Sequence, residues 1–407
     1  PARPAPQQAP ILGGSASKVV VKARRLHTMG PLGSIDKGLI FIEDGKIKAV
    51  GSEGALEIPE GTQILEAAVV TPGLIDAHGV AGLTGIFNVR ADQDHDESSG
   101  PVQSALRAID GFNPEERLLD YLLSFGITAV HTGPSPSNPI AGQSGVFKTW
   151  GHSVTDCTVR FPAAMLFTLG ERPKSVYGAR HQAPSTRMGT AAVIRRALNR
   201  AREYGRSLDR WKQTGKGDKP DYDADLEALL PVISGKLPAM FTAHREDDIL
   251  TAVRLAREFG LHAILDAATE GYLVRNEIAT SGYPVIAGPG MLRLGGLETM
   301  NASLENPALL LEKKIPLALG TGYESYVPKT RVILFEAGMC STYGMGFDRA
   351  LQAITIDAAR LLHVDDRIGS IEPGKDADIV LFDGNPFEYT SQIRRVLVNG
   401  NLVLDRK

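Results

Sequence analysis

Short apolar segments alternate with helical patterns through the middle of this chain, and this alternation constrains the fold more than any other feature. The apolar segments cover residues 128–130, 239–243, 263–265, 284–287 and 316–320. Residues 247–259, between two of them, have a clear amphipathic helical period. Such alternation is typical of parallel β/α units. We therefore expect a (β/α)₈ TIM-like barrel over residues 71–365, with its chemistry at the C-terminal ends of the strands.

The two ends of the chain have a different pattern. Residues 18–70 contain short β-branched runs and an Asp44-Gly45 turn signal, and residues 366–407 repeat this style around Asn399-Gly400. Both ends are predicted to complete one small β-sandwich. Residues 1–17 are rich in Pro and small polar side chains, so we expect a disordered or loosely attached arm.

Composition excludes several classes of protein. With 407 residues, 43% hydrophobic and 22% charged, the chain can bury a large core. A net charge of −3 gives no broad basic field, so we expect neither nucleic acid nor anionic membrane as a partner. No apolar run approaches the roughly 18 residues that a membrane span needs.

The cysteine content and the opening residues bear on location. Cys157 and Cys340 cannot form a disulfide framework or a thiolate cluster, although one pair remains possible. The Pro/Ala/Gln-rich residues 1–10 are similar to the segment left after a secretory signal is removed. We expect a periplasmic or extracellular protein, with a cytoplasmic location as the alternative.

Four phrases carry a family resemblance. They are VTPGLIDAHGV at 70–80, NPIAGQSGVFK at 138–148, HREDDI at 244–249 and GSIEPGKDADIV at 369–380. Together with the opening sheet, these phrases resemble the amidohydrolase superfamily, in its imidazolonepropionase-like and prolidase-like branches.

The resemblance implies a metal centre that activates water. Such proteins hold divalent ions with two histidines on the first strand, a mid-barrel lysine or acid, and histidines ending strands five and six. An aspartate ending strand eight handles the proton of the bound water. By position, His78, Lys148 and His244 match metal ligands of this set.

Three positions depart from the family pattern. Val80 replaces the second first-strand histidine, Ala267 replaces the sixth-strand histidine, and Gly322 replaces the catalytic aspartate. None of these side chains donates a lone pair. The loss of a general base alone would cost a factor of about 10²–10⁴ in rate.

Other side chains offer partial replacements. The nearest carboxylates in the sequence are Asp266, beside Ala267, and Glu324, two residues after Gly322. Asp266 is the weaker candidate if Ala267 faces the lumen, because neighbouring strand residues point to opposite faces. We expect His131 to be a hydrogen-bonded structural residue. Two further segments have alternative interpretations: Asp92, Asp94, His95, Asp96 and Glu97 form a solvated loop or a hard-cation site, and residues 187–222 form a solvated charged helix or a binding patch.

Three hypotheses follow for function. The first is a non-catalytic structural or regulatory subunit without a metal, pairing with itself or with an intact amidohydrolase paralogue. The second is a hydrolase of cyclic amides, N-acyl amino acids or dipeptides, with one divalent ion such as zinc at a remodelled site. The third is a small-molecule binder whose pocket includes His78 and the substrate-binding candidates Arg245 and Glu246.

Overall fold

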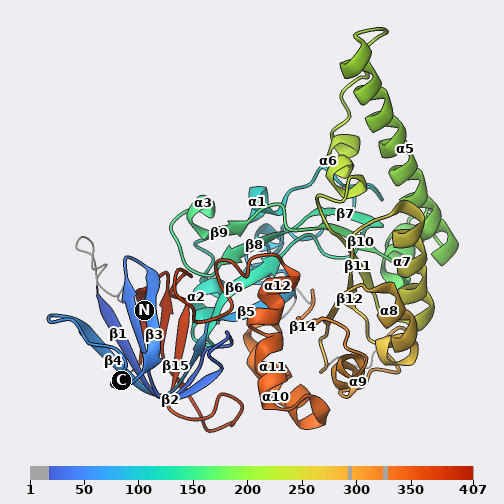
Figure 1. The fold of residues 1–407 in the computed structure, drawn as a ribbon. Coiled ribbons are helices and arrows are strands. Elements are labelled where there is room, and N and C mark those ends of the chain that lie inside the picture. The colour runs from blue at the N-terminus through green and yellow to red at the C-terminus, as the bar shows by residue number, and fades with distance from the viewer. Residues whose placement is uncertain (1–17, 292–295, 324–328, 407) are drawn as a thin grey trace, which may run out of the picture. The chain divides into compact units, whose positions relative to one another are not determined.

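A computed structural model describes residues 18–291, 296–323 and 329–406 (Figure 1). The chain divides into two compact units, residues 1–74 with 366–407 and residues 75–365. The predicted boundaries were 70/71 and 365/366. The predicted arm at residues 1–17 and Glu324 lie outside the described residues.

The first unit is a sheet built from both ends of the chain. Its order is β17-β16-β15-β4-β1-β2-β3, and β15 runs antiparallel to β4. The strands are β1 (Val19–His27), β2 (Ser34–Glu43), β3 (Lys46–Ser52), β4 (Gln63–Pro72), β15 (Ile379–Phe382), β16 (Ile393–Val398) and β17 (Asn401–Asp405). Ile40, Ile42, Ile379 and Leu397 share one buried core. The described pairing joins all seven strands in one sheet, and a sandwich of two facing sheets stays a prediction.

The second unit contains a six-stranded sheet of order β14-β13-β12-β11-β10-β7. Five of these strands are parallel: β10 (Met165–Thr168), β11 (Ala239–Ala243), β12 (Ala263–Ala267), β13 (Val285–Ala287) and β14 (Leu317–Leu319). Thr242 lies opposite Asp266, and Asp266 lies opposite Ile286. Because paired residues share a face, the register determines which side chains meet inside the unit.

A four-stranded sheet of order β5-β6-β8-β9 completes the strands of this unit. Its members are β5 (Leu74–Gly79), β6 (Ile127–Thr132), β8 (Gly145–Lys148) and β9 (Thr158–Arg160). Ser144 alone separates β8 from β7 (Ile140–Gln143), so one stretch of chain joins both sheets. This stretch runs antiparallel to β6 and to β10, unlike the all-parallel barrel predicted from sequence. The connection after β6 is too short for a parallel crossover, which needs a dozen or more residues.

The two sheets also meet where β14 leads back to β5. The Gly322 amide donates a 2.9 Å hydrogen bond to the His78 carbonyl. A Cβ at Gly320 would lie 3.0 Å from the His78 amide nitrogen. These approaches give a TIM-barrel-like arrangement, although the strand pairings of the described residues do not form a closed ring.

Helices follow most of the parallel strands. The α-helices of the second unit are α1 (Ala108–Gly111), α2 (Arg117–Leu123), α3 (Val154–Cys157), α4 (Glu171–Gly178), α5 (Arg187–Thr214), α6 (Ala224–Ile233), α7 (Glu246–Phe259), α8 (Arg275–Ser281), α9 (Asn306–Glu312), α10 (Ile333–Cys340), α11 (Phe347–Ala353) and α12 (Ile356–Leu361). Helix α7 begins with three acidic residues, which favour the positive end of its dipole, and ends at the left-handed Gly260. Because α7 begins three residues after β11 ends, its N-terminus lies next to His244 at the C-terminal end of β11.

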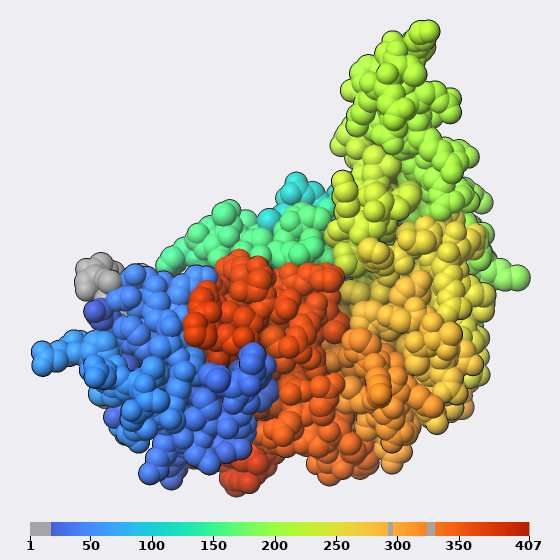
Figure 2. Space-filling view, in the orientation of Figure 1, coloured from blue at the N-terminus to red at the C-terminus, as the bar shows by residue number. Residues whose placement is uncertain are grey.

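Helices α5 and α6 form a hairpin that projects from the rest of the second unit (Figure 1, and in green in Figure 2). The N-terminal half of α5 buries Ile194, Leu198 and Ala201. Tyr204 donates a 2.6 Å hydrogen bond to Glu227 and so ties α5 to α6.

Two expectations about the whole chain can be compared with this fold. In the part of the chain that is described, no helix is both long and apolar enough to cross a bilayer. Cys157 and Cys340 are buried as free thiols, so they do not form the pair that the sequence left open.

Gly288 is a test of the close approach between β13 and β14. A Cβ there would lie 2.1 Å from the Gly320 carbonyl oxygen, at a φ of +135°. We expect Gly288→Ala to lower the free energy of unfolding by about 3 kcal/mol, because the backbone must shift or strain. Denaturant unfolding followed by circular dichroism measures this loss.

Gly260→Ala is the matched control, because its φ is +66° but no atom lies within 4 Å of the added Cβ. We expect this variant to lose only about 1 kcal/mol. Equal losses in the two variants would contradict the predicted crowding.

Candidate functional site

A buried ion pair lies at the centre of the second unit. Nδ1 of His78, on β5, lies 2.8 Å from Oδ1 of Asp266, on β12, and both side chains are under 5% exposed. Thr242 donates a 2.7 Å hydrogen bond to the other carboxylate oxygen. Asp266 thus uses both oxygens within the site.

The two partners stabilise each other's charged form. Burial lowers the pKa of His78, but the charge and hydrogen bond of Asp266 outweigh it, so this pKa lies above its ordinary value of 6.5. Burial raises the pKa of Asp266, but His78 and Thr242 together hold it below its ordinary value of 3.8. An imidazolium facing a carboxylate is the expected state.

His244 follows β11 and shares the face of Thr242. Nδ1 lies 2.7 Å from the Thr269 hydroxyl, and Nε2 lies 2.7 Å from the Tyr323 hydroxyl. Burial lowers the pKa of His244, so its imidazole is neutral. The Tyr323 ring centre lies 6.4 Å from that of His78 and 6.3 Å from that of His244, so this tyrosine contacts the space between the two histidines.

His131, on β6, is a hydrogen-bonded structural residue, as its sequence position predicted. Its Nδ1 lies 2.7 Å from the Ala77 carbonyl and must carry the proton, since a carbonyl can only accept. Its Nε2 then accepts from the Ser144 hydroxyl at 2.7 Å. Burial lowers the pKa of His131 to about 3, which keeps it neutral.

Lys148 lies inside the same unit but deeper. It pairs with Ala129 in the β6–β8 ladder, while His131 pairs with Val146, so Lys148 and His131 face the same side. Lys148 is 1% exposed and lies two positions farther from the C-terminal end of β6. Its role as a metal ligand stays a prediction.

Asp76 is a buried acid that the sequence reasoning did not single out. It shares the His78 face of β5 and accepts a 2.9 Å hydrogen bond from the Thr321 amide. Burial raises its pKa, despite the hydrogen bonds from Thr321 and Thr330 that act in the opposite direction. Its place two residues before His78 was the available signal, because alternate strand residues share a face.

Val80, Ala267 and Gly322, where the family resemblance led us to expect two histidines and an aspartate, have different backbone conformations. Val80 is buried just after β5. Ala267 has φ +64°, and Gly322 has φ +75° with only 3.0 Å between an added Cβ and Cδ of Pro289. An aspartate at position 322 would be strained in this backbone.

One expectation is corrected. The sequence made Asp266 the weaker substitute because Ala267 was placed toward the lumen. Asp266 instead points inward beside Thr242, and Ala267 pairs with Ala243 on the other face. The strand therefore presents a carboxylate at the level where the family pattern has an imidazole.

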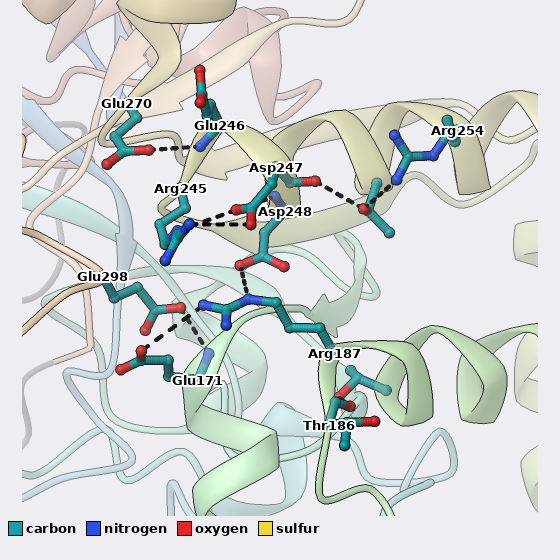
Figure 3. Close-up of polar contacts among 12 residues, drawn as sticks. Glu171, Thr186, Arg187, Arg245, Glu246, Asp247, Asp248, Arg254, Glu270 and Glu298 are labelled. Atoms are coloured by element: carbon teal, nitrogen blue, oxygen red, sulfur yellow. Dashed lines mark hydrogen bonds and ion pairs between the residues drawn. The ribbon is translucent and has the colours of Figure 1, made fainter.

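The substrate-binding candidates lie at the start of α7 (Figure 3). Arg245 forms an ion pair with Asp247 at 3.2 Å, and the Glu246 amide donates to Glu270 at 2.8 Å, while the Glu246 side chain is exposed. Arg187 pairs with Asp248 at 2.9 Å beside them. Binding of substrate by Arg245 and Glu246 stays a prediction.

The acidic loop after β5 is committed to its own turn and to its surroundings. Asp92 accepts the amides of Phe87 and Val89, and Asp96 pairs with Arg172 at 3.4 Å. His95 is largely buried, and burial lowers its pKa. These contacts favour the solvated-loop interpretation.

The donor set present does not fit a resident metal ion. Among the described residues, no three His, Cys, Asp or Glu side chains are arranged to hold one. Apart from the Asp266 carboxylate 2.8 Å from Nδ1, neither ring nitrogen of His78 has a hydrogen-bond partner within the described ranges, whereas both nitrogens of His244 and of His131 are hydrogen-bonded. Because Nδ1 of His78 faces Asp266, only its Nε2 is left without a partner, and one imidazole nitrogen is too few for a structural or catalytic site.

Comparisons with known proteins agree with this fold. The model of the amidohydrolase family matches residues 326–403. A solved amidohydrolase from Thermotoga maritima MSB8 is 34% identical, with a TM-score of 0.90, and the alignment covers 96% of this chain and all of that one. The chain therefore belongs to the amidohydrolase family.

Curated relatives refine this placement. An imidazolonepropionase from Geobacillus sp. (strain WCH70) is 26% identical over 91% of this chain and 89% of its own length. The amidohydrolase tasK from Hapsidospora irregularis is also 26% identical over 91% of this chain, which spans only 39% of the length of tasK. The similarity to imidazolonepropionases places the chain in the imidazolonepropionase-like branch.

Asp266→Asn tests the central ion pair. We expect the variant to lose roughly 3 kcal/mol of unfolding free energy near pH 5.5, because a buried imidazolium loses its counter-charge. A raised pKa means that the contribution of His78 is complete below 6.5 and is lost as the pH rises through that raised value. The difference between wild type and variant should therefore shrink toward pH 9 in urea unfolding.

The acid limit and a control complete this test. Asp266 has a lowered pKa, so its contribution is complete above 3.8 and falls as the pH falls through the lowered value. Asp36→Asn removes an exposed partner of Arg25 and should change stability by less than about 0.5 kcal/mol. A difference for Asp266→Asn that does not vary with pH would count against the charged pair.

Proposed function

We propose that this protein is a non-hydrolytic member of the amidohydrolase family, a structural or regulatory subunit whose interior polar residues stabilise the fold. One observation carries the proposal. His78 and Asp266 satisfy each other in a buried ion pair, and Thr269 and Tyr323 occupy both nitrogens of His244. The side chains that could bind a metal ion, His78, Asp266 and His244, are thus engaged with partners inside the protein.

The missing general base supports the same proposal. Position 322 is a glycine in a left-handed backbone. Asp266 is held as a carboxylate by His78, so taking a proton from water would break the ion pair. Asp76 has a raised pKa and is hydrogen-bonded by Thr321 and by the His78 amide. No carboxylate of the described site is both ionised and unengaged.

A hydrolase remains a second candidate, favoured by the retention of His78, His244 and Asp266 in one interior. By similarity to its relatives, it would act on cyclic amides, N-acyl amino acids or dipeptides at a remodelled site with one divalent ion. This candidate predicts hydrolysis that a chelator abolishes and that His244→Ala removes. If folded protein turns over no compound in a panel of cyclic amides, N-acyl amino acids and dipeptides, the hydrolase candidate is refuted.

Metal analysis of the purified protein is the deciding experiment. We expect less than about 0.1 equivalent of zinc, manganese, iron, cobalt or nickel per chain, because too few donors converge. Elemental mass spectrometry measures this content, and the hydrolysis panel is run on the same sample. One tightly held ion per chain, or chelator-sensitive turnover, would overturn the non-hydrolytic proposal.

Restoring a lost donor tests the position assignment. Val80→His with Tyr323→Phe places an imidazole two residues after His78 and releases Nε2 of His244. We expect the dissociation constant for Zn²⁺ to fall at least about tenfold relative to wild type, because three imidazoles then face one space. Titration calorimetry with zinc measures the change.

The matched control is Val89→His with Tyr323→Phe, since Val89 is 51% exposed and lies outside the interior. This variant should bind zinc no better than about twofold relative to wild type. Equal gains in both double variants would contradict the assignment of Val80 to a former ligand position.

A further inference from the structure

A pocket of about 470 Å³ lies within the second unit, at the N-terminal ends of β11 to β14. Its lining includes the four residues that directly precede these strands, Pro238, His262, Pro284 and Pro316. His244 follows β11, so the candidate functional site is at the opposite ends of the strands. Small-molecule sites have volumes of roughly 300–1,000 Å³, so the pocket is large enough for a separate ligand.

The floor of this pocket is apolar for a reason that lies in the backbone. Three of the four residues before the strands are prolines, which have no amide proton to leave unpaired at the edge of a sheet. The carbonyls of all four accept hydrogen bonds of 2.8–3.0 Å from the neighbouring strands. Ala263, Ile264 and Leu361 add buried apolar side chains to the lining. The floor therefore offers a ligand mainly hydrophobic contact.

Polar side chains line the rest of the pocket. Helix α12, which packs beside β14 (Figure 1), contributes Arg360, and His363 follows that helix. Arg360, His363 and His262 are exposed, so a ligand on the floor can reach them. Burial raises the pKa of Tyr283, despite the opposing charge of Arg257, so the phenol keeps its proton and can donate it to a ligand.

The charge beside α12 is positive. Arg360 and Arg349 share the carboxylate of Asp357, at 3.1 Å and 3.7 Å. One carboxylate cannot neutralise two guanidinium groups. Arg160 adds a third guanidinium, whose Nη1 donates a 3.2 Å hydrogen bond to the His363 carbonyl and whose buried Nε has no hydrogen-bond partner in the described part of the chain.

Two features oppose an anion at this place. Helices α8 and α12 end at the pocket, with the negative ends of their dipoles, and Asp365 lies near enough to His363 to raise its pKa. A full guanidinium charge nevertheless exceeds the roughly half charge of a helix end. Burial, and after it Arg160, hold the pKa of His363 below its ordinary value of 6.5, so its ring is neutral and can donate one N–H.

We propose that this pocket binds a small organic carboxylate, with the carboxylate group at Arg360 and a compact apolar body on the floor. Asp357 contacts Nη1 of Arg360, and the Arg360 side chain is 59% exposed, so other N–H groups of its planar fork are accessible. Tyr283 and His363 supply further donors. The inference goes beyond the proposed function, because it concerns the other ends of the strands and does not depend on metal content.

A ligand-observed NMR titration of the full chain with cinnamate tests the proposal. We expect a dissociation constant of about 1 mM or below, which a ligand of roughly 11 non-hydrogen atoms can reach. Cinnamamide keeps the shape without the charge, and acetate keeps the charge without the apolar body, so each should bind at least about tenfold more weakly. Undetectable binding of cinnamate, or equal binding of cinnamamide or acetate, would overturn the proposal.

Arg360→Gln tests where the carboxylate lies. The dissociation constant for cinnamate should rise at least about fivefold, because the charged fork is removed from an exposed side chain. Arg349→Gln is the matched control, since Arg349 also pairs with Asp357 but lies outside the pocket lining, and it should stay within about twofold of wild type. Circular dichroism checks that both variants are folded.

Arg245→Gln distinguishes the two ends of the strands. Arg245 lies at the start of α7, beyond the C-terminal end of β11, so this variant should also bind cinnamate within about twofold of wild type. Weaker binding by Arg245→Gln would place cinnamate at the candidate functional site instead. That result, or equal weakening by Arg360→Gln and Arg349→Gln, would overturn the proposal.

Discussion

The interior of the second unit depends on one buried ion pair, His78 with Asp266. It connects β5 to β12, strands from the two separately paired sheets. Each partner would be costly alone, because an unpaired charge in this environment loses its hydration without compensation. Together with Thr242 and the neutral His244, the pair defines a polar centre inside the barrel-like unit.

A second constraint is the close approach of backbones around this centre. Gly288, Gly320 and Gly322 allow β13, β14 and β5 to meet without side chains between them. On the other side, Ser144 separates β7 from β8, and its hydroxyl donates a hydrogen bond to the neutral His131 ring. Individual hydrogen bonds, from Gly322 to His78 and from Ser144 to His131, therefore connect the two sheets where they are not joined by continuous strand pairing.

Some of this could be predicted from the sequence, and some could not. The strands that include residues 239–243 and 263–265 were predicted because long amphipathic or apolar segments carry a strong period. Strands β7 to β10 were missed as strands, because they are only three or four residues long, and β7 and β8 also include glycine. Pairing of the two chain ends was foreseen from their turn-rich β patterns.

The candidate site, like the fold, was predicted only in part from the sequence. Position-by-position resemblance located His78 and His244 inside the unit, since a motif fixes both sequence and strand. The inward direction of Asp266 was not foreseen, because a one-residue difference in register reverses the face of every side chain. Tyr323 was missed because its importance comes from a contact with the distant His244, which no local pattern reports, whereas the strand spacing from His78 could have indicated Asp76.

The backbone at Gly322 has a consequence for how this chain can change. A mutation to aspartate there would have to adopt a left-handed conformation against Pro289, so the substitution would harm folding before it could help chemistry. The neighbouring loop would need to be rebuilt first. A single change to aspartate at this position would therefore not by itself supply a well-placed base.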